Sequence, residues 1–67
     1  MVNFSSCAES ARLDLGMTSQ YLSFKTGIHY QTLRKYLRGK QEMLVSDWFA
    51  ICKVLYLDPV TGKSKIN

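Results

Sequence analysis

No carboxylate occurs between Asp14 and Glu42, and this absence divides the chain into parts of different charge. The acid-free part carries five basic side chains: Lys25, Arg34, Lys35, Arg38 and Lys40. The rest of the chain has four basic and five acidic residues, so the formal net charge of +4 comes from one segment. A nearly neutral body with one basic segment indicates a polyanionic partner. A solvated basic face is the alternative interpretation.

Long apolar runs and targeting signals are also lacking. No run approaches the roughly 20 apolar residues that a membrane-spanning helix requires. The first residues do not combine a basic start with an apolar stretch, as a secretory signal does. The sequence therefore predicts a cytoplasmic protein with no membrane partner.

Residues that carry chemistry are scarce. Cys7 and Cys52 lie far apart and lack metal-ligand spacing, which predicts two free buried thiols, with a disulfide or a redox sensor as the alternative. His29 is the single histidine and has no second ligand at metal spacing. The chain has no paired carboxylates, no Ser/His/Asp arrangement and no glycine-rich phosphate loop. The sequence predicts no enzyme, no metal, no cofactor and no small-molecule ligand.

What is present is enough for one small folded domain, expected to span residues 1–67. An apolar fraction of 46% is ordinary for a globular protein. A single core of this size is marginal, so dimerisation would add stability. No long period-two strand is visible, and the predicted fold class is all-α.

Capping residues and apolar spacing predict four helices. Ser6 and Glu9 fit a capping box at the start of the first helix. Thr18 or Ser19 is expected to cap the second helix, and Ser46 the fourth. The expected helices cover about residues 7–15, 19–26, 30–38 and 47–56.

The segment from about residue 18 to residue 38 has the pattern of a helix-turn-helix. Gly27 stands where the turn needs a residue that can take a positive φ. The apolar side chains that would face inward across a steep crossing are Leu22, Ile28, Leu33 and Tyr36. The opposite face of the third helix then carries Tyr30, Gln31, Arg34, Lys35 and Arg38. A helix with such a face fits the major groove of B-DNA, so the sequence predicts binding to double-stranded DNA.

Several short patterns in this register belong together. An arginine stands four residues before a glycine in the first helix, Arg-Gly-Lys closes the third helix, and the fourth ends in an I-x-x-x-L-x-x-D pattern. The residues concerned are Arg12, Gly16, Leu22, Gly27, Ile28, Leu33, Arg38, Gly39, Lys40, Ile51, Leu55 and Asp58. In this combination, residues 12–58 resemble the Cro/phage-repressor (XRE-type) helix-turn-helix family without a gap.

The resemblance implies a compact helical domain, usually dimeric, that binds a pseudopalindromic operator, and the four expected helices make this a four-helix Cro-like domain. A bacterial or phage transcriptional repressor is the function it implies, and such a protein would be nucleoid-associated when bound. An activator is a variant of this interpretation, because a helix-turn-helix alone does not set the sign of regulation.

Four positions depart from the family pattern. Ser23 replaces the usual alanine at the tight helix contact, and its hydroxyl is expected to bond back to the preceding turn. Leu37 replaces the glutamate that usually pairs with the arginine of the first helix, so Arg12 needs another partner, or reaches solvent or phosphate. Met43 stands where proline is common. The family's fifth helix is cut to residues 59–62, within a short polar tail (59–67) whose closing residues 61–67 are expected to fray.

The resemblance and the polar face together assign DNA contacts. Gln31 suits adenine and Arg34 suits guanine, in each case through two hydrogen bonds. The expected base-reading residues are Tyr30, Gln31, Arg34 and Lys35. The expected backbone contacts are Thr18, Ser19, Gln20, His29, Thr32, Arg38 and Lys40. Each of these is alternatively a solvated, capping or partly buried residue, and Lys63 and Lys65 of the tail could also touch phosphate.

Two apolar surfaces are not explained by DNA. Phe49 and Tyr56 on the fourth helix are predicted homodimer contacts, with burial under the tail as the alternative. Tyr21 and Phe24 on the second helix either pack on Phe4 or form a patch for a heterologous partner. These surfaces support a second possible function, a protein-binding antirepressor or antitoxin of the same fold.

Overall fold

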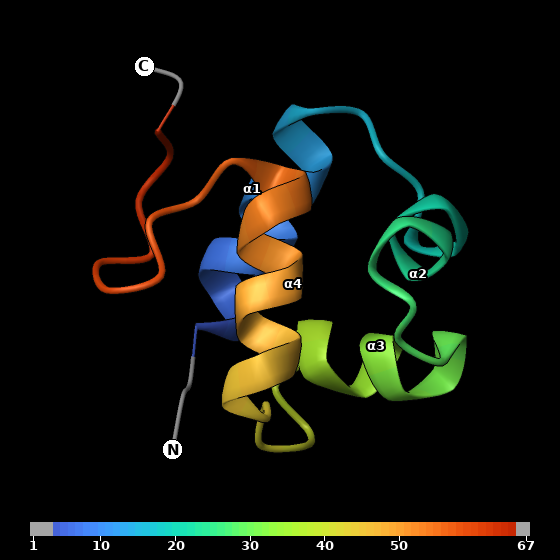
Figure 1. The fold of residues 1–67 in the computed structure, drawn as a ribbon. Coiled ribbons are helices and arrows are strands. Elements are labelled where there is room, and N and C mark those ends of the chain that lie inside the picture. Colours follow the sequence, from blue (N-terminus) through green and yellow to red (C-terminus); the bar gives the residue numbers. More distant parts are fainter. Residues whose placement is uncertain (1–3, 66–67) are drawn as a thin grey trace.

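The computed structural model describes residues 4–65 and contains four α-helices in chain order (Figure 1). The helices are α1 (Ser5–Asp14), α2 (Ser19–Thr26), α3 (Tyr30–Leu37) and α4 (Val45–Leu55). Among the described residues, strand-like pairing is limited to isolated bridges such as that between Leu57 and Ser64. The all-α prediction is therefore confirmed, and each predicted helix lies within two residues of its observed bounds.

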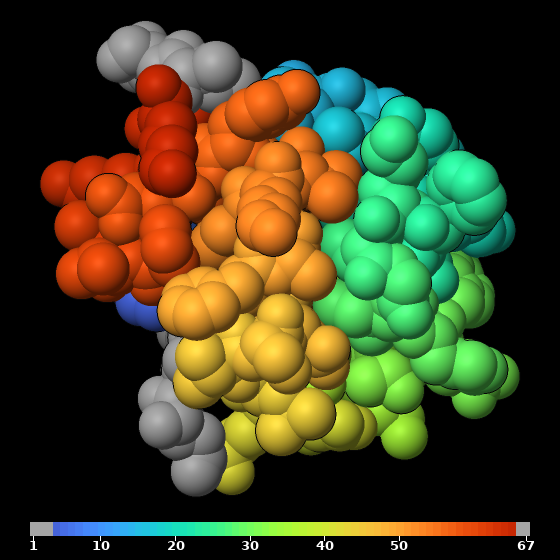
Figure 2. Space-filling view, viewed as in Figure 1, coloured from blue at the N-terminus to red at the C-terminus, as the bar shows by residue number. Residues whose placement is uncertain are grey.

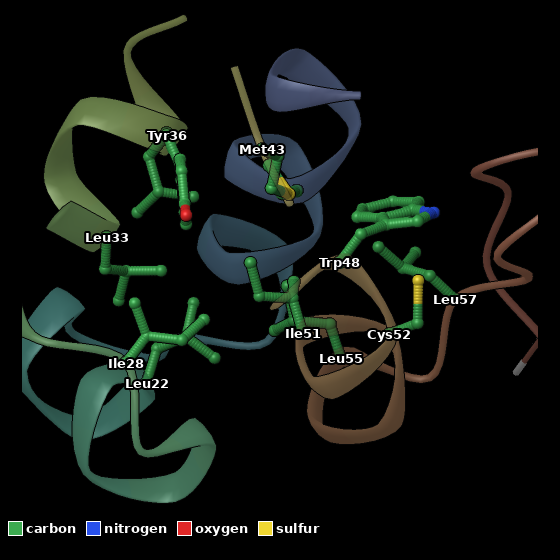
Figure 3. Close-up of a cluster of buried hydrophobic side chains, with 12 residues drawn as sticks. Leu22, Ile28, Leu33, Tyr36, Met43, Trp48, Ile51, Cys52, Leu55 and Leu57 are labelled. Carbon is green, nitrogen blue, oxygen red and sulfur yellow. The ribbon is translucent and has the colours of Figure 1, made fainter. Parts of the chain in front are cut away.

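Helix α4 packs on α1 and α2, and α3 packs on the same two helices. In Figure 1, α2 and α3 lie on one side of α4 and the chain after α4 lies on the other. All four helices contribute to one hydrophobic core (Figure 3). Its largest fully buried side chains are Trp48, Tyr36, Leu22, Leu33, Ile51 and Leu55. The four side chains expected to face inward from the helix-turn-helix are all buried, as predicted.

The start of α2 follows the sequence prediction, and the start of α1 does not. The Thr18 hydroxyl accepts a hydrogen bond from the Tyr21 amide at 3.0 Å, so Thr18 rather than Ser19 is the cap. The capping box of Ser6 and Glu9 is wrong, because α1 begins at Ser5, two residues before the predicted start. Its N-cap is Phe4, which has no side chain that can cap. Tertiary packing of Phe4 therefore sets where α1 begins.

Ser46 is likewise not the cap of α4. The helix begins at Val45, and Leu44 is the N-cap in an extended conformation. Asp47 lies in the first turn, where a negative charge is favourable. Its carboxylate accepts a 2.6 Å hydrogen bond from the hydroxyl of Tyr36. The pKa of Tyr36 is raised, mainly because its hydroxyl is buried and in addition because of this hydrogen bond. The start of α4 is therefore held by the hydrogen bond between Tyr36 of α3 and Asp47 of α4, and not by the local cap at Ser46 that the sequence predicted.

The chain after α4 is folded rather than frayed as far as Lys65, which corrects the prediction for the described part of the tail. The Asp58 carboxylate accepts the Val60 amide at 2.8 Å, and the Asp58 amide donates to the Lys63 carbonyl at 2.8 Å. The Trp48 indole donates to the Pro59 carbonyl at 2.9 Å. Residues 59–62 therefore form a turn docked on α4, and residues 66–67 lie outside the described part.

This turn closes tightly against α1. Gly62 is buried with φ +73°, a conformation that L side chains rarely adopt. A Cβ placed on it would lie 3.0 Å from the Phe4 ring and 3.2 Å from the Cys7 sulfur. The Phe4 ring in turn stacks on Trp48, with 4.8 Å between ring centroids. The two ends of the described chain thus meet over the same tryptophan.

Candidate nucleic-acid interface

The turn between α2 and α3 is held by hydroxyl groups. Gly27 adopts φ +76° as the C-cap of α2, as predicted. The Ser23 hydroxyl donates to the Ile28 carbonyl at 2.5 Å, which corrects the expectation that it bonds back to the preceding turn. Thr26 makes that backward bond instead, to the Leu22 carbonyl at 2.8 Å. The Ser23 bond spans Gly27 and joins α2 to the buried residue that follows the turn glycine. The angle between α2 and α3 is therefore fixed at the turn.

Helix α3 is divided into two faces. Leu33, Tyr36 and Leu37 are buried beneath it. Leu37, which stands at the position of the family's glutamate, is buried with this face. The residues that remain exposed on α3 and after it are Gln31, Lys35, Arg38 and Lys40, while Tyr30, Thr32 and Arg34 are half-buried. The structure thus gathers the expected DNA-facing residues on one surface.

Two of these residues are joined to each other. Arg34 donates from Nη1 to the Tyr30 hydroxyl at 3.2 Å. The same guanidinium lies over the Tyr30 ring, 5.8 Å from its centroid. Tyr30 and Arg34 are four residues apart, so they are neighbours on the helix surface. Sequence reasoning placed both on this face but did not pair them.

Arg12 has the new partner that the loss of the family's glutamate requires. Its Nε and Nη2 donate to the two carboxylate oxygens of Glu9 at 2.8 and 2.9 Å. Its Nη1 donates to the Met17 carbonyl at 2.6 Å, directly before the Thr18 cap. The hydrogen bonds from Arg12 lower the pKa of Glu9 below its ordinary value of 4.5, against the opposing effect of burial. Arg12 therefore ties α1 to the loop that leads into α2.

A small pocket of about 140 Å³ lies where α1, α2 and α3 meet. It is lined by Glu9, Arg12, Ser19, Arg34, Leu37 and Arg38. The positive charges of Arg34 and Arg38 also lower the pKa of Glu9. Sequence reasoning missed Glu9 at this surface, although its place three residues before Arg12 puts both on one helix face.

The remaining expected backbone contacts lie near helix starts. Thr18 and Gln20 are exposed and Ser19 is half-buried at the start of α2. The His29 ring caps α3, because its Nδ1 accepts a hydrogen bond from the Gln31 amide at 3.3 Å. Ser19 lines the same pocket as Arg34 and Arg38, so the start of α2 lies beside the polar face of α3.

The aromatic side chains outside the buried core differ in how far they are covered. Phe4 packs on Trp48, so the expectation that Tyr21 and Phe24 pack on Phe4 is wrong. Tyr21 is 48% exposed and Phe24 82% exposed on α2.

Phe49 on α4 and Tyr56, the C-cap of that helix, are about half-exposed. In Figure 2, α4 runs along the surface between the tail and α2. Phe49 lines a groove between α4 and the tail without being covered by it.

Neither cysteine forms a disulfide. Cys52 is buried, as predicted, and burial raises its pKa to about 11. Cys7 is only half-buried, which corrects the prediction for that thiol. Within residues 4–65 no group of three or more His, Cys, Asp or Glu is placed to hold a metal ion. No described helix has the length and apolar character needed to cross a membrane.

A tight helix-turn-helix whose second helix turns a basic face outward is the architecture of a DNA-binding domain. Residues 9–60 match the sequence model of the helix-turn-helix family. The chain therefore belongs to the XRE-type helix-turn-helix family, and it is a DNA-binding transcription regulator. No curated protein and no solved structure matches the chain.

Proposed function

We propose that the protein is a Cro-like repressor, of a phage or a bacterium, that binds a pseudopalindromic operator as a homodimer. Two copies of α3 lie in successive major grooves, about 34 Å apart. The observation that carries this proposal is the division of α3 into a buried apolar face and an outer face bearing Gln31, Arg34 and Lys35. An occupied operator blocks access of the polymerase.

Base recognition comes from the first turns of α3. Gln31 is exposed, and its amide can accept and donate at once, as the N7 and N6 groups of adenine require. Arg34 offers the parallel donors that suit guanine O6 and N7. Tyr30 and Lys35 flank this pair on the same face.

Phosphate contacts set the register of the helix on the duplex without reading bases. Lys40 and Arg38 lie at the end of α3, and Ser19 lies at the start of α2, where the helix dipole favours an anion. The further contacts proposed are Thr18, Gln20, His29 and Thr32. Binding is therefore expected to weaken steeply as salt is raised.

The proposed dimer uses the outer side of α4. Phe49 is 49% exposed and Tyr56 is 53% exposed. Tyr56 also holds φ +58°, a conformation that costs a non-glycine residue more than it would cost glycine. Sedimentation at tens of micromolar tests this step, because Phe49→Glu should convert a dimer into a monomer. A wild-type protein that sediments as a monomer would contradict it.

The experiment that tests the function is selection of bound sites from random-sequence duplex DNA, followed by sequencing. An inverted repeat with half-site centres about ten base pairs apart is the expected result. The matched control is the double variant Gln31→Ala with Arg34→Ala, which should remain folded and enrich no site. If the wild-type protein enriches nothing above a salt-sensitive background, the repressor proposal fails.

A second candidate function is a protein-binding antirepressor or antitoxin, and the exposure of Tyr21 and Phe24 favours it. Large apolar side chains grouped on a surface often mark a protein contact. Retention of biological activity by the Gln31 and Arg34 double variant, with loss in Phe24→Ala, would support this function instead.

A further inference from the structure

We propose that Tyr30 is a positioning residue, which holds the guanidinium of Arg34 at the N-terminal end of α3 for recognition of guanine. This inference rests on the proposed function, since it concerns how one base is read. It changes the role of Tyr30 from a direct DNA contact to a support for its neighbour.

The contact has two components. The Arg34 Nη1 donates to the Tyr30 hydroxyl at 3.2 Å, and the guanidinium lies over the ring at 5.8 Å from its centroid. The hydrogen bond fixes the direction of the planar guanidinium, while the ring attracts its positive charge. Both components come from one side chain on the same helix, so they do not depend on DNA being present.

The direction of the contact matters for the groove. Side chains on an α-helix point toward its N-terminus, and one turn raises the chain by about 5.4 Å. The contact with Tyr30, the first residue of α3, therefore draws the Arg34 guanidinium toward the end of the helix that meets the bases. Without this contact, the long side chain of Arg34, one turn further along α3, would be free to sample several rotamers.

Arg34 also has a competing position. It lines the same pocket as Glu9, and the two charges are close enough for Arg34 to lower the pKa of that carboxyl. An ion pair between them would draw Arg34 away from DNA. Arg12 donates to both carboxylate oxygens of Glu9, whereas the hydrogen bond of the Arg34 guanidinium goes to Tyr30.

Holding the guanidinium before binding reduces the side-chain freedom that is lost when DNA arrives. The gain applies to the base that Arg34 reads and not to the phosphate contacts. Loss of the Tyr30 hydroxyl should consequently alter base preference at one position while leaving salt-dependent, non-specific binding unchanged.

The test compares Tyr30→Phe with wild type, using operators that carry each base at the position read by Arg34. Tyr21→Phe on α2 is the matched control, because it removes a tyrosine hydroxyl away from α3. In Tyr30→Phe the preference for guanine should fall roughly fivefold, the ratio expected from one hydrogen bond. Tyr21→Phe should leave it unchanged. In an Arg34→Ala background, Tyr30→Phe should have no further effect on base preference.

Two results would overturn the inference. One is an unaltered guanine preference in Tyr30→Phe; the other is an equal loss from Tyr30→Phe with and without Arg34, which would make Tyr30 a direct reader. A second measurement needs no DNA: the NMR signal of the Arg34 Nε–H should be restrained in the free wild-type protein and mobile in Tyr30→Phe. Failure of the proposed function differs from both, because the wild type would then enrich no sequence at all.

Discussion

The two sides of this molecule are held together by interactions of different range. In the helix-turn-helix, the Thr18 cap and the hydroxyl bonds of Ser23 and Thr26 join residues no more than five positions apart. On the other side, Phe4 from one end of the described chain and Pro59 from the other both contact Trp48. A local bond such as the Thr18 cap follows a known sequence pattern, whereas contacts between chain ends cannot be read from one.

The side of the molecule proposed to bind DNA is therefore different from the side whose packing stabilises the fold. The outer face of α3 is supported from beneath by Leu33 and Tyr36 and from the turn by local hydrogen bonds. Its DNA-facing side chains can therefore change with little effect on folding. The side formed by α4 and the tail carries no expected base contact, but its aromatic packing closes the core.

The largest expected effect comes from Trp48→Ala. Trp48 is 1% exposed, and removal of a buried tryptophan side chain costs about 3–5 kcal/mol in free energy of unfolding. A domain of this size has a total of similar order, so the variant should be mostly unfolded.

Urea unfolding followed by circular dichroism is the appropriate measurement, because Trp48 is the single tryptophan and its fluorescence is lost. Phe24→Ala is the control on the other side of the molecule. Phe24 is 82% exposed, so that change should alter stability by no more than about 0.5 kcal/mol. Similar losses in free energy of unfolding for Trp48→Ala and Phe24→Ala would contradict the view that the α4 side, and not the outer face of α2, carries the stability.

Two glycines with nearly equal φ sharpen the comparison further. Gly27→Ala at φ +76° meets nothing within 4 Å, so only the backbone strain of about 1–2 kcal/mol is expected. Gly62→Ala at φ +73° carries the same strain and also crowds Phe4, for an expected total of about 2–4 kcal/mol. Thermal unfolding of both variants measures the difference. Equal losses would mean that the turn is not packed tightly on α1.

Salt dependence tests which side contacts DNA. Lys40 follows α3, whereas Lys63 belongs to the tail after α4. That segment lies on the other side of α4 from α3 (Figure 1). Lys40→Ala should reduce the slope of log affinity against log salt by about 0.9, the value for one phosphate contact. Lys63→Ala should leave the slope unchanged. DNA-binding titrations at several salt concentrations measure the slope for both variants. A reduced slope in Lys63→Ala would show that the tail also contacts DNA phosphate.

The smallest effect concerns the ion pair of Arg12 and Glu9. The folded-state pKa of Glu9 lies below its ordinary 4.5, so the charged carboxylate stabilises the fold above that pH. This contribution is lost as pH falls through the lowered pKa. Glu9→Gln should therefore be less stable than wild type near neutral pH and equal to it in strong acid. Melting temperatures measured between about pH 2 and pH 7 test this, and a constant difference would contradict it.

The sequence predicted the helix-turn-helix well because its signals are local. The Thr18 cap, the turn at Gly27 and the burial of Leu22 and Leu33 all follow from patterns within one or two helical turns. Ser46 was wrong as a cap because Asp47 is held by Tyr36 from another helix. The predictions for Ser46 and for the tail each missed a partner that is distant in the sequence, whereas the prediction for Ser23 failed although its true partner, Ile28, is only five residues away.

The candidate site shows the same division. Polar spacing was sufficient to place Gln31, Arg34 and Lys35 on one face of α3. It did not reveal that Tyr30 bonds to Arg34, because the same spacing allows either side chain to point toward solvent. Nor did it reveal the Glu9 pair, since the departure at Leu37 left several partners open for Arg12.

The sequence by itself determined the basic segment, the amphipathic third helix and the family to which the chain belongs. These properties depend on residue type and on spacing within a short stretch. Only the tertiary structure decided that Phe4 covers Trp48, that the tail folds onto α1 around Gly62, and that Arg12 pairs with Glu9. Their energies arise from burial, space or competition among several possible partners, and these are settled only when the whole core is assembled.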